Sequence, residues 1–227
     1  MKREYLSLKV YEWFYIVFWC TLISIVTFIN GSTIYAIISC LFGVIAASLN
    51  IFNKRTAFIF YVLYALSYGI ISFLNNNYGE ALLNIFYNTP LYIFTVYKLF
   101  YKNKIEGVKI QSLNIKKWII ISLIIPFVTI IYGTILNLFE NSNMPYVNAL
   151  ATGFAVVSSF MASKRYKEQW IFWIGYSIVL IYLWMFNDGE QAYLYLNIFY
   201  TITNVIGLIL WYRQYKYEKN IVAIENK

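Results

Sequence analysis

Runs of apolar residues, each roughly 20 residues long, alternate along the chain with short polar segments. A helix of that length spans a bilayer, because each residue adds about 1.5 Å and the hydrocarbon layer is about 30 Å thick. The pattern therefore predicts an all-α integral membrane protein with eight transmembrane helices. Their predicted ranges are 10–30, 32–52, 56–75, 80–102, 118–138, 144–163, 169–187 and 190–212.

The last two predicted helices carry the most distinctive pattern. Trp170 and Trp173 begin the first of them and, three residues apart, project from the same side of a helix. A polar turn at 187–190 leads into the second, where rings and amides follow one face. That face consists of Tyr193, Asn197, Tyr200 and Asn204. Amide groups are unfavourable in hydrocarbon unless they are hydrogen-bonded, so we expect this face to meet other helices or a ligand.

Composition supports a membrane protein and excludes several kinds of chemistry. The chain is 61% hydrophobic and 12% charged, about half the charged fraction of a soluble protein. It has no histidine, so the usual general base and metal ligand are missing, and we expect no metal and no cofactor. Cys20 and Cys40 have no C-x-x-C spacing and are interpreted as buried hydrophobes. The basic segment 1–9 precedes an apolar run too long for a signal peptide, so that run is expected to remain as a helix.

Charge is segregated between alternate loops. All 18 lysines and arginines fall on one predicted side of the membrane, whereas the loops of the other side carry only acidic charges. Under the positive-inside rule, both termini are cytoplasmic. The net charge of +8 is therefore explained by topology, and no nucleic-acid partner is expected. The lipid bilayer is the expected surrounding.

An internal repeat divides the predicted helices. The matching segments are Lys54-Arg55 with Lys164-Arg165, Gly79-Glu80 with Gly189-Glu190, and Asn84–Tyr87 with Asn197–Tyr200. One helix lies between two three-helix units, so both units cross the membrane in the same sense. Many transporters have such parallel repeats. Gene duplication also produced receptors and membrane enzymes. The predicted parts are an N-terminal helix at 1–31, a first repeat at 32–104, a linker with helix 5 at 105–143, a second repeat at 144–216, and a cytoplasmic tail at 217–227.

The candidate binding residues lie near the middle of the predicted helices. Trp173, Asn197 and Asn204 bracket the midplane, whereas Trp170 lies nearer the cytoplasmic surface, where it also suits the interfacial aromatic belt. The two asparagines equally suit interhelical hydrogen bonds. Further candidates are Tyr200, Ser177, Asn84 and Asn88, whereas the stripe of Tyr61, Tyr64 and Tyr68 is interpreted as packing. Indole faces and amides favour a flat aromatic ligand with polar edges, and the absence of a buried Arg or Lys disfavours a phosphorylated one.

The W-I-F-W segment at 170–173 is followed by an asparagine in the next helix, and the helices form a 3-1-3 repeat. In these features the chain resembles the Pnu vitamin transporters, in particular the PnuC-type nicotinamide riboside carriers. The fold also resembles that of the SWEET transporters. The resemblance covers about residues 10–216. It implies that Trp170 and Trp173 flank the nicotinamide side of a pocket, with Asn197 or Asn204 bonding the ligand. It also implies a bacterial plasma membrane location and a homotrimer. Other Pnu branches carry thiamine, riboflavin or deoxynucleosides.

Three other functions remain for comparison, one of which is a structural or assembly protein of the membrane. A substrate-binding subunit of an ATP-driven vitamin importer would also be small and basic, but the internal repeat argues against it. An intramembrane enzyme is not expected, because no acid–base pair or metal ligand set lies within a helix. Every Asp and Glu is predicted to lie at a surface, with Glu80 on the outer one, so no carboxylate is available to bind a coupling ion. We therefore expect facilitated diffusion by alternating access, followed by trapping through a cytoplasmic kinase.

Overall fold

The structure is a computed structural model that describes residues 8–102, 110–140, 142–186 and 190–225, with side chains up to residue 219. The described residues form helices and no strand; one isolated bridge joins Gln111 to Tyr166. The helices are α1 (Val10–Ile29), α2 (Ile34–Ile51), α3 (Ala57–Leu74), α4 (Tyr78–Leu82), the π-helix η1 (Leu83–Asn88), α5 (Thr89–Tyr97), the π-helix η2 (Lys98–Lys102), α6 (Ile115–Leu136), α7 (Pro145–Ser163), α8 (Gln169–Met185) and α9 (Ala192–Glu225).

Six of the described helices are long and apolar enough to cross a membrane. They are α1, α2, α3, α6, α7 and α9. The apolar helix α8 is shorter, with 17 residues, and the predicted helix 80–102 is a helical segment interrupted by two π-helices. The last helix continues well past its predicted end at 212, to Glu225. The expected turn residues 187–189 lie outside the described residues.

Several helices begin where a side chain accepts a free backbone N–H group. The Thr33 hydroxyl accepts from Ala36 N at 3.3 Å, and Asn114 Oδ1 accepts from Lys117 N at 3.0 Å. At the start of α1, Glu12 Oε2 accepts from Lys9 N at 2.8 Å. α7 begins with Pro145, which has no N–H group to satisfy. These local signals explain why the polar breaks in the sequence coincide with helix starts.

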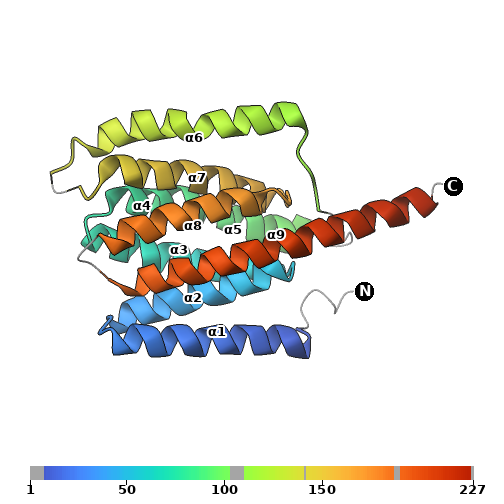
Figure 1. Cartoon of the computed structure of the whole chain (residues 1–227), viewed down its shortest axis with the longest axis horizontal. Coiled ribbons are helices and arrows are strands. Elements are labelled where there is room, and N and C mark those ends of the chain that lie inside the picture. Colours follow the sequence, from blue (N-terminus) through green and yellow to red (C-terminus); the bar gives the residue numbers. More distant parts are fainter. Residues whose placement is uncertain (1–7, 103–109, 141, 187–189, 226–227) are drawn as a thin grey trace.

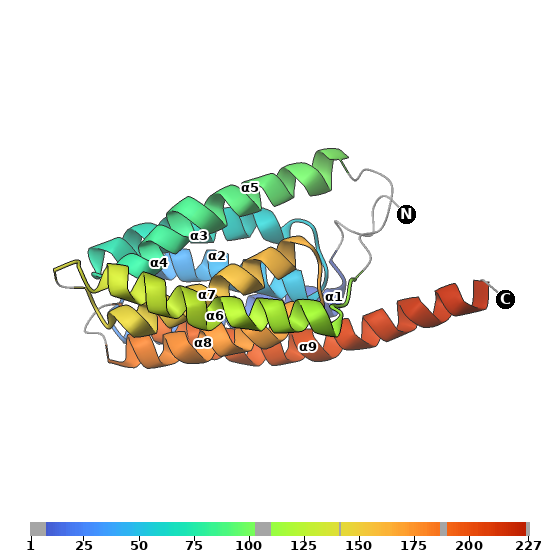
Figure 2. The same cartoon turned by 90° about the horizontal axis from the view of Figure 1, so that it is seen from above.

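The helices form one elongated bundle. α1 and α6 lie on opposite edges of it, and the second half of α9 extends beyond it (Figure 1). Seen from above, α5 forms one side and α8 and α9 the other, with α2, α3 and α7 between them (Figure 2). α6 packs chiefly on α7, and α1 packs on α2 and α9. In the most apolar stretch of each helix, only 22% of the residues of α1 and 17% of those of α6 are buried. The outer faces of both helices are therefore suited to contact lipid.

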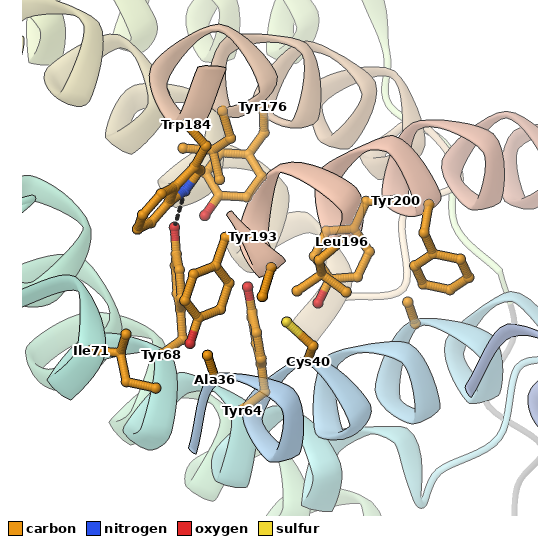
Figure 3. Packing of buried hydrophobic residues seen from close by; sticks show 14 of the residues in the cluster. Ala36, Cys40, Tyr64, Tyr68, Ile71, Tyr176, Trp184, Tyr193, Leu196 and Tyr200 are labelled. Atoms are coloured by element: carbon orange, nitrogen blue, oxygen red, sulfur yellow. Dashed lines mark hydrogen bonds between the residues drawn. The ribbon is translucent and has the colours of Figure 1, made fainter. Parts of the chain in front are cut away.

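Small residues on α2 allow its neighbours to approach closely. Ala36, Cys40, Val44 and Ala47 are buried at spacings of four and three residues, so they form one face. Large aromatic side chains of α3, α8 and α9 fill the space opposite. Figure 3 shows rings from these helices gathered around Tyr68, whose hydroxyl accepts a hydrogen bond from Trp184 Nε1 at 3.2 Å. The bundle is thus held by aromatic packing against a small-residue helix.

The basic residues of the described chain lie at one end of the bundle. Lys54, in the α2–α3 turn, pairs with Glu12 of α1 at 3.0 Å. In the α7–α8 turn, Lys167 pairs with Glu168 at 3.0 Å, and the Arg165 guanidinium lies 4.7 Å from the Trp211 ring. Burial lowers the pKa of Arg165 to about 9, and the nearby Arg55 adds to this effect. At the other end, Thr33 N donates to Glu190 Oε2 at 3.2 Å.

The contact between Gly207 and Trp170 gives a stability prediction. A Cβ atom at Gly207 would lie 2.7 Å from Trp170 Cδ2, so Gly207→Ala must displace a buried ring. Overpacking of this kind costs about 1–3 kcal/mol, more than the gain of up to about 1 kcal/mol from removing a helix glycine. We expect a lower unfolding temperature in detergent for Gly207→Ala, and partial recovery when Trp170→Leu is added.

Val205→Ala on the exposed side of the same helix is the matched control and should change stability little. A Gly207→Ala protein as stable as wild type would show that the ring does not occupy this position.

Candidate functional site

A small cavity lies inside the bundle, where helices from both halves of the chain meet. Its volume is about 30 Å³. The residues that line it are Ala47, Tyr61, Tyr64, Asn84, Asn88, Tyr92, Trp173, Tyr176, Tyr200 and Asn204. They come from α2, α3, η1, α5, α8 and α9. The lining therefore consists of aromatic rings and amides around one small residue of α2.

Helical spacing explains why these side chains converge. α3 contributes two tyrosines three residues apart, and α8 contributes a tryptophan and a tyrosine three residues apart. α9 contributes a tyrosine and an asparagine four residues apart. Residues at these spacings share one face of a helix, so each pair points in the same direction. Ala47 leaves room for the tyrosine rings where α2 passes between α3 and α9.

The π-helix η1 carries the two asparagines of the wall. The Thr89 N–H group donates to Asn84 O, five residues earlier, and the Thr89 hydroxyl donates to the same oxygen at 2.8 Å. Pro90 follows directly, and proline has no N–H group and collides with the carbonyl of the preceding turn. The helix is therefore wider just before Pro90. The π-helix therefore ends directly before α5, whose second residue is Pro90.

A buried carboxyl group holds one end of a hydrogen-bond chain along the wall. Glu80 is fully buried and accepts from the Tyr176 hydroxyl at 2.7 Å. Asn84 Nδ2 donates to Glu80 Oε2 at 3.3 Å and to the Glu80 carbonyl at 2.9 Å. The expectation that Glu80 lies at the outer surface is therefore wrong. The sequence places Glu80 near the start of a helix, but it does not show that α7 and α8 cover that turn.

The chain continues from Asn84 toward α7. Asn88 Nδ2 donates to Asn84 Oδ1 at 3.0 Å, and Asn88 Oδ1 accepts from the Ser159 hydroxyl at 2.8 Å. The hydroxyls of Ser159 and Tyr92 lie 3.1 Å apart. These bonds fix the rotamers of both asparagines, so the two amides present defined edges to the cavity.

Other polar groups of the lining have no partner among the described residues. The Trp173 indole N–H and the hydroxyls of Tyr64 and Tyr200 are buried without a hydrogen bond. The Asn204 side chain, which is 5% exposed, lines the same cavity. A buried donor without a partner is costly. Several such groups around one cavity therefore indicate a place where a polar ligand or water completes the bonds.

The structure brings five of the predicted candidates together in this cavity and places three elsewhere. Those in the lining are Trp173, Tyr200, Asn204, Asn84 and Asn88. Trp170 is 1% exposed and packs on Trp211, with ring centroids 5.5 Å apart, so it lies in neither the cavity lining nor an exposed aromatic belt. Asn197 is fully buried and donates to Tyr193 O at 2.7 Å. Ser177 accepts from the Thr201 hydroxyl at 3.0 Å, outside the lining.

Four tyrosines of the lining were not among the predicted candidates. Tyr61 and Tyr64 had been interpreted as packing, which is incomplete because both also line the cavity. Tyr92 and Tyr176 complete the set. Tyr176 could have been found from its spacing, since it lies three residues after Trp173, and their rings are 5.4 Å apart. Tyr92 carries no such signal in the sequence, where 23 tyrosines are spread over the chain.

The electrostatics of the cavity are set by neutral dipoles and one carboxyl group. The expectation that no Arg or Lys is buried is wrong, since Arg165 is 3% exposed, but no lysine or arginine is among the lining residues. The described residues include no group of three His, Cys, Asp or Glu side chains that could hold a metal ion. The arrangement can stack a flat ring and hydrogen-bond its polar edge, and it offers no cation to a phosphate.

Comparisons with known proteins point in one direction. The family model described as nicotinamide mononucleotide transporter matches residues 33–213. A protein of Neisseria mucosa named nicotinamide riboside transporter PnuC is 25% identical over 171 residues, which cover 70% of this chain and 64% of that protein. A protein of the same name from Haemophilus influenzae is 24% identical over 186 residues, which cover 78% of each chain.

A solved structure shares the fold. The crystal structure of the vitamin B3 transporter PnuC superposes with a TM-score of 0.78 at 20% identity, covering 92% of this chain and 94% of the other. The described helices are therefore arranged as in a known multi-pass membrane protein. Because the family model covers most of the sequence, this chain belongs to the nicotinamide mononucleotide transporter family, which is a family of transporters and not of enzymes.

Proposed function

We propose that this protein transports nicotinamide riboside, or a similar unphosphorylated vitamin or nucleoside, through the cavity between α3, η1, α8 and α9. The observation that carries the proposal is the lining itself, where aromatic faces alternate with amides and unpaired donors. A pyridinium ring stacks favourably on an indole face, and a carboxamide or ribose hydroxyl matches an asparagine amide. The names of the two curated relatives support this ligand.

The lining favours the riboside over the mononucleotide named in the family description. A phosphate group brings negative charge, which needs charge-assisted hydrogen bonds when it is buried. The lining contains no lysine or arginine, and Glu80 lies directly behind it. A phosphorylated ligand would therefore be repelled. The same property allows trapping, because a ligand that is phosphorylated in the cytoplasm could not re-enter the site.

Ligand entry requires the helices or their side chains to move. A volume of about 30 Å³ is that of about one water molecule, whereas small-molecule sites occupy roughly 300 Å³ or more. The π-helix before Pro90 is a suitable point of adjustment, since π-helical turns within α-helices are frequent at functional sites. Alternating access then consists of opening this closed cavity to one side at a time.

We further infer that eight helical segments cross the membrane, as an N-terminal helix and two parallel three-helix units that α6 connects in the sequence. α8 and the segment from Tyr78 to Lys102 would be the two crossings beyond the six apolar helices. Both termini would face the cytoplasm, because the described basic residues gather at the end of the bundle where α1 begins. By family resemblance, the protein would be a homotrimer in a bacterial plasma membrane.

The ligand site can be tested with Trp173→Ala. Loss of stacking should cost on the order of 1–2 kcal/mol, or roughly tenfold in affinity. Asn204→Leu should have a similar effect, because it leaves a polar group of the ligand unpaired. Isothermal titration of the purified protein with nicotinamide riboside, thiamine, riboflavin and deoxynucleosides gives both the preferred ligand and the losses.

Trp170→Phe is the matched control for this experiment. It removes a tryptophan from the same helix at a position that packs on Trp211, so we expect lower thermal stability with unchanged affinity. Unchanged affinity of Trp173→Ala for every ligand that wild type binds would place the site elsewhere.

The topology can be tested at the two ends of α7, with both native cysteines replaced by alanine. Asn143 lies just before this helix, and Lys164 follows it. We expect an impermeant thiol reagent to label Asn143→Cys in intact cells and to label Lys164→Cys only after the membrane is opened. Labelling of Lys164→Cys in intact cells would reverse the proposed orientation.

The transport mode can be tested in liposomes with the membrane potential clamped at zero. Facilitated diffusion predicts that unmodified nicotinamide riboside reaches equal concentrations on both sides, and that a proton or sodium gradient does not change this final level. Liposomes without protein measure leakage. Accumulation driven by either gradient would contradict facilitated diffusion, and its loss in Glu80→Gln would assign the coupling to that carboxyl group.

A further inference from the structure

The buried carboxyl group of Glu80 has no described partner of opposite charge. It accepts hydrogen bonds from Tyr176 on α8 and Asn84 on η1. Glu80 Oε1 is buried and has no hydrogen-bond partner among the described residues. The described ion pairs of Lys54 and Lys167 lie at the basic end of the bundle, and neither includes Glu80. Its partners are therefore neutral dipoles.

The groups around Glu80 on the packed helices are uncharged as well. The Tyr68 hydroxyl of α3 is near the carboxyl group and accepts from Trp184. On α6, the Tyr132 hydroxyl donates to the carbonyl of Gly79 at 3.4 Å. On α7, the Asn148 side chain lies close to the position that a Cβ atom at Gly79 would take. None of these side chains supplies a positive charge, so a buried negative charge here is only partly compensated.

Both hydrogen-bond partners of the Glu80 carboxyl group also line the cavity. Tyr176 and Asn84 each have a face on the cavity and donate their polar hydrogen to Glu80 on the other side. The carboxyl group therefore lies one side chain behind the wall. The Trp173 ring, in contact with Tyr176, lines the same cavity. A ligand stacked on Trp173 would be separated from the carboxylate by one layer of protein atoms.

We propose that Glu80 is a specificity-determining residue that selects for a positively charged heteroaromatic ring over a neutral ring of the same shape. The ligand supplies the counter-charge that the described protein lacks around Glu80. Tyr176 and Asn84 keep the carboxylate away from the ligand ring. The attraction between the ligand and Glu80 is therefore electrostatic and does not require a direct contact, which would slow release of the ligand. This role rests on the proposed function, because it needs the ligand to occupy the cavity.

The proposal predicts a charge-dependent effect of a nearly isosteric change. Glu80→Gln keeps the size of the side chain and can still accept from Tyr176, but it removes the negative charge. A unit charge one side chain away, in surroundings of low effective dielectric constant, changes affinity by on the order of tenfold. A neutral ring should lose little, because stacking on Trp173 and the amide bonds remain.

The experiment is calorimetric binding of two ligands to wild type, Glu80→Gln and Glu190→Gln. The ligands are nicotinamide riboside, which carries a pyridinium charge, and its dihydro form, which has nearly the same shape and no ring charge. We expect Glu80→Gln to bind the cation about tenfold more weakly and the neutral form with less than about threefold change. Glu190→Gln, which changes a carboxylate that bonds Thr33 N and does not line the cavity, should leave both affinities unchanged.

Each other outcome has a distinct meaning. Equal losses for both ligands in Glu80→Gln would show a structural role and overturn the proposal, as would no loss for either. Wild-type protein that binds the neutral form as tightly as the cation would also overturn the proposal. This measurement needs no variant, so it still decides the question if the Glu80→Gln protein does not fold. Wild-type protein that binds neither ligand would refute nicotinamide riboside as the ligand of the cavity, and the role of Glu80 with it, whereas the proposed function would fail only if thiamine, riboflavin and deoxynucleosides did not bind either.

Discussion

The hydrogen bond from Tyr176 to Glu80 is the contact on which the arrangement of the cavity depends. It joins α8 to α4 across 96 residues of sequence, inside a bundle whose other contacts are largely apolar. A carboxyl group buried among hydrocarbon helices must find donors, and few positions supply them. Meeting this need orients Tyr176 and Asn84, and through Asn84 it orients Asn88 and Ser159. The amide edges of the cavity follow from this chain of bonds.

Much of the fold could be predicted from the sequence, because it depends on local patterns. Apolar runs of helical length, and caps such as Thr33 and Asn114, mark where the helices begin. The interruption of the segment from Tyr78 to Lys102 by π-helices was less accessible, since only Pro90 signals it. The segregation of basic residues was visible in the sequence, whereas the burial of Glu80 was not. Burial depends on which helices cover a turn, and no local pattern encodes that.

The two tryptophans show the limit of spacing arguments for the site. Trp170 and Trp173 share a helix side, yet Trp173 lines the cavity and Trp170 packs between Gly207 and Trp211. The glycine on α9 creates the space that Trp170 fills, and nothing within α8 reports its presence. The same holds for Asn197 and Asn204, one of which turns back to the Tyr193 carbonyl. Side chains on one face of a helix can therefore meet different neighbours along its length.

The lining is divided between two groups of helices, which suggests how ligand binding and movement are connected. Tyr64 and the two asparagines of η1 belong to the α2–α5 side, whereas Trp173 and Asn204 belong to α8 and α9. Each side offers a few modest interactions, and several donors are unpaired when the groups close without a partner. A ligand that pairs with both sides lowers the energy of the closed state relative to either open state. A neutral-walled cavity with the Glu80 carboxyl group behind it can do this for a flat cation while keeping the interactions weak enough to release it.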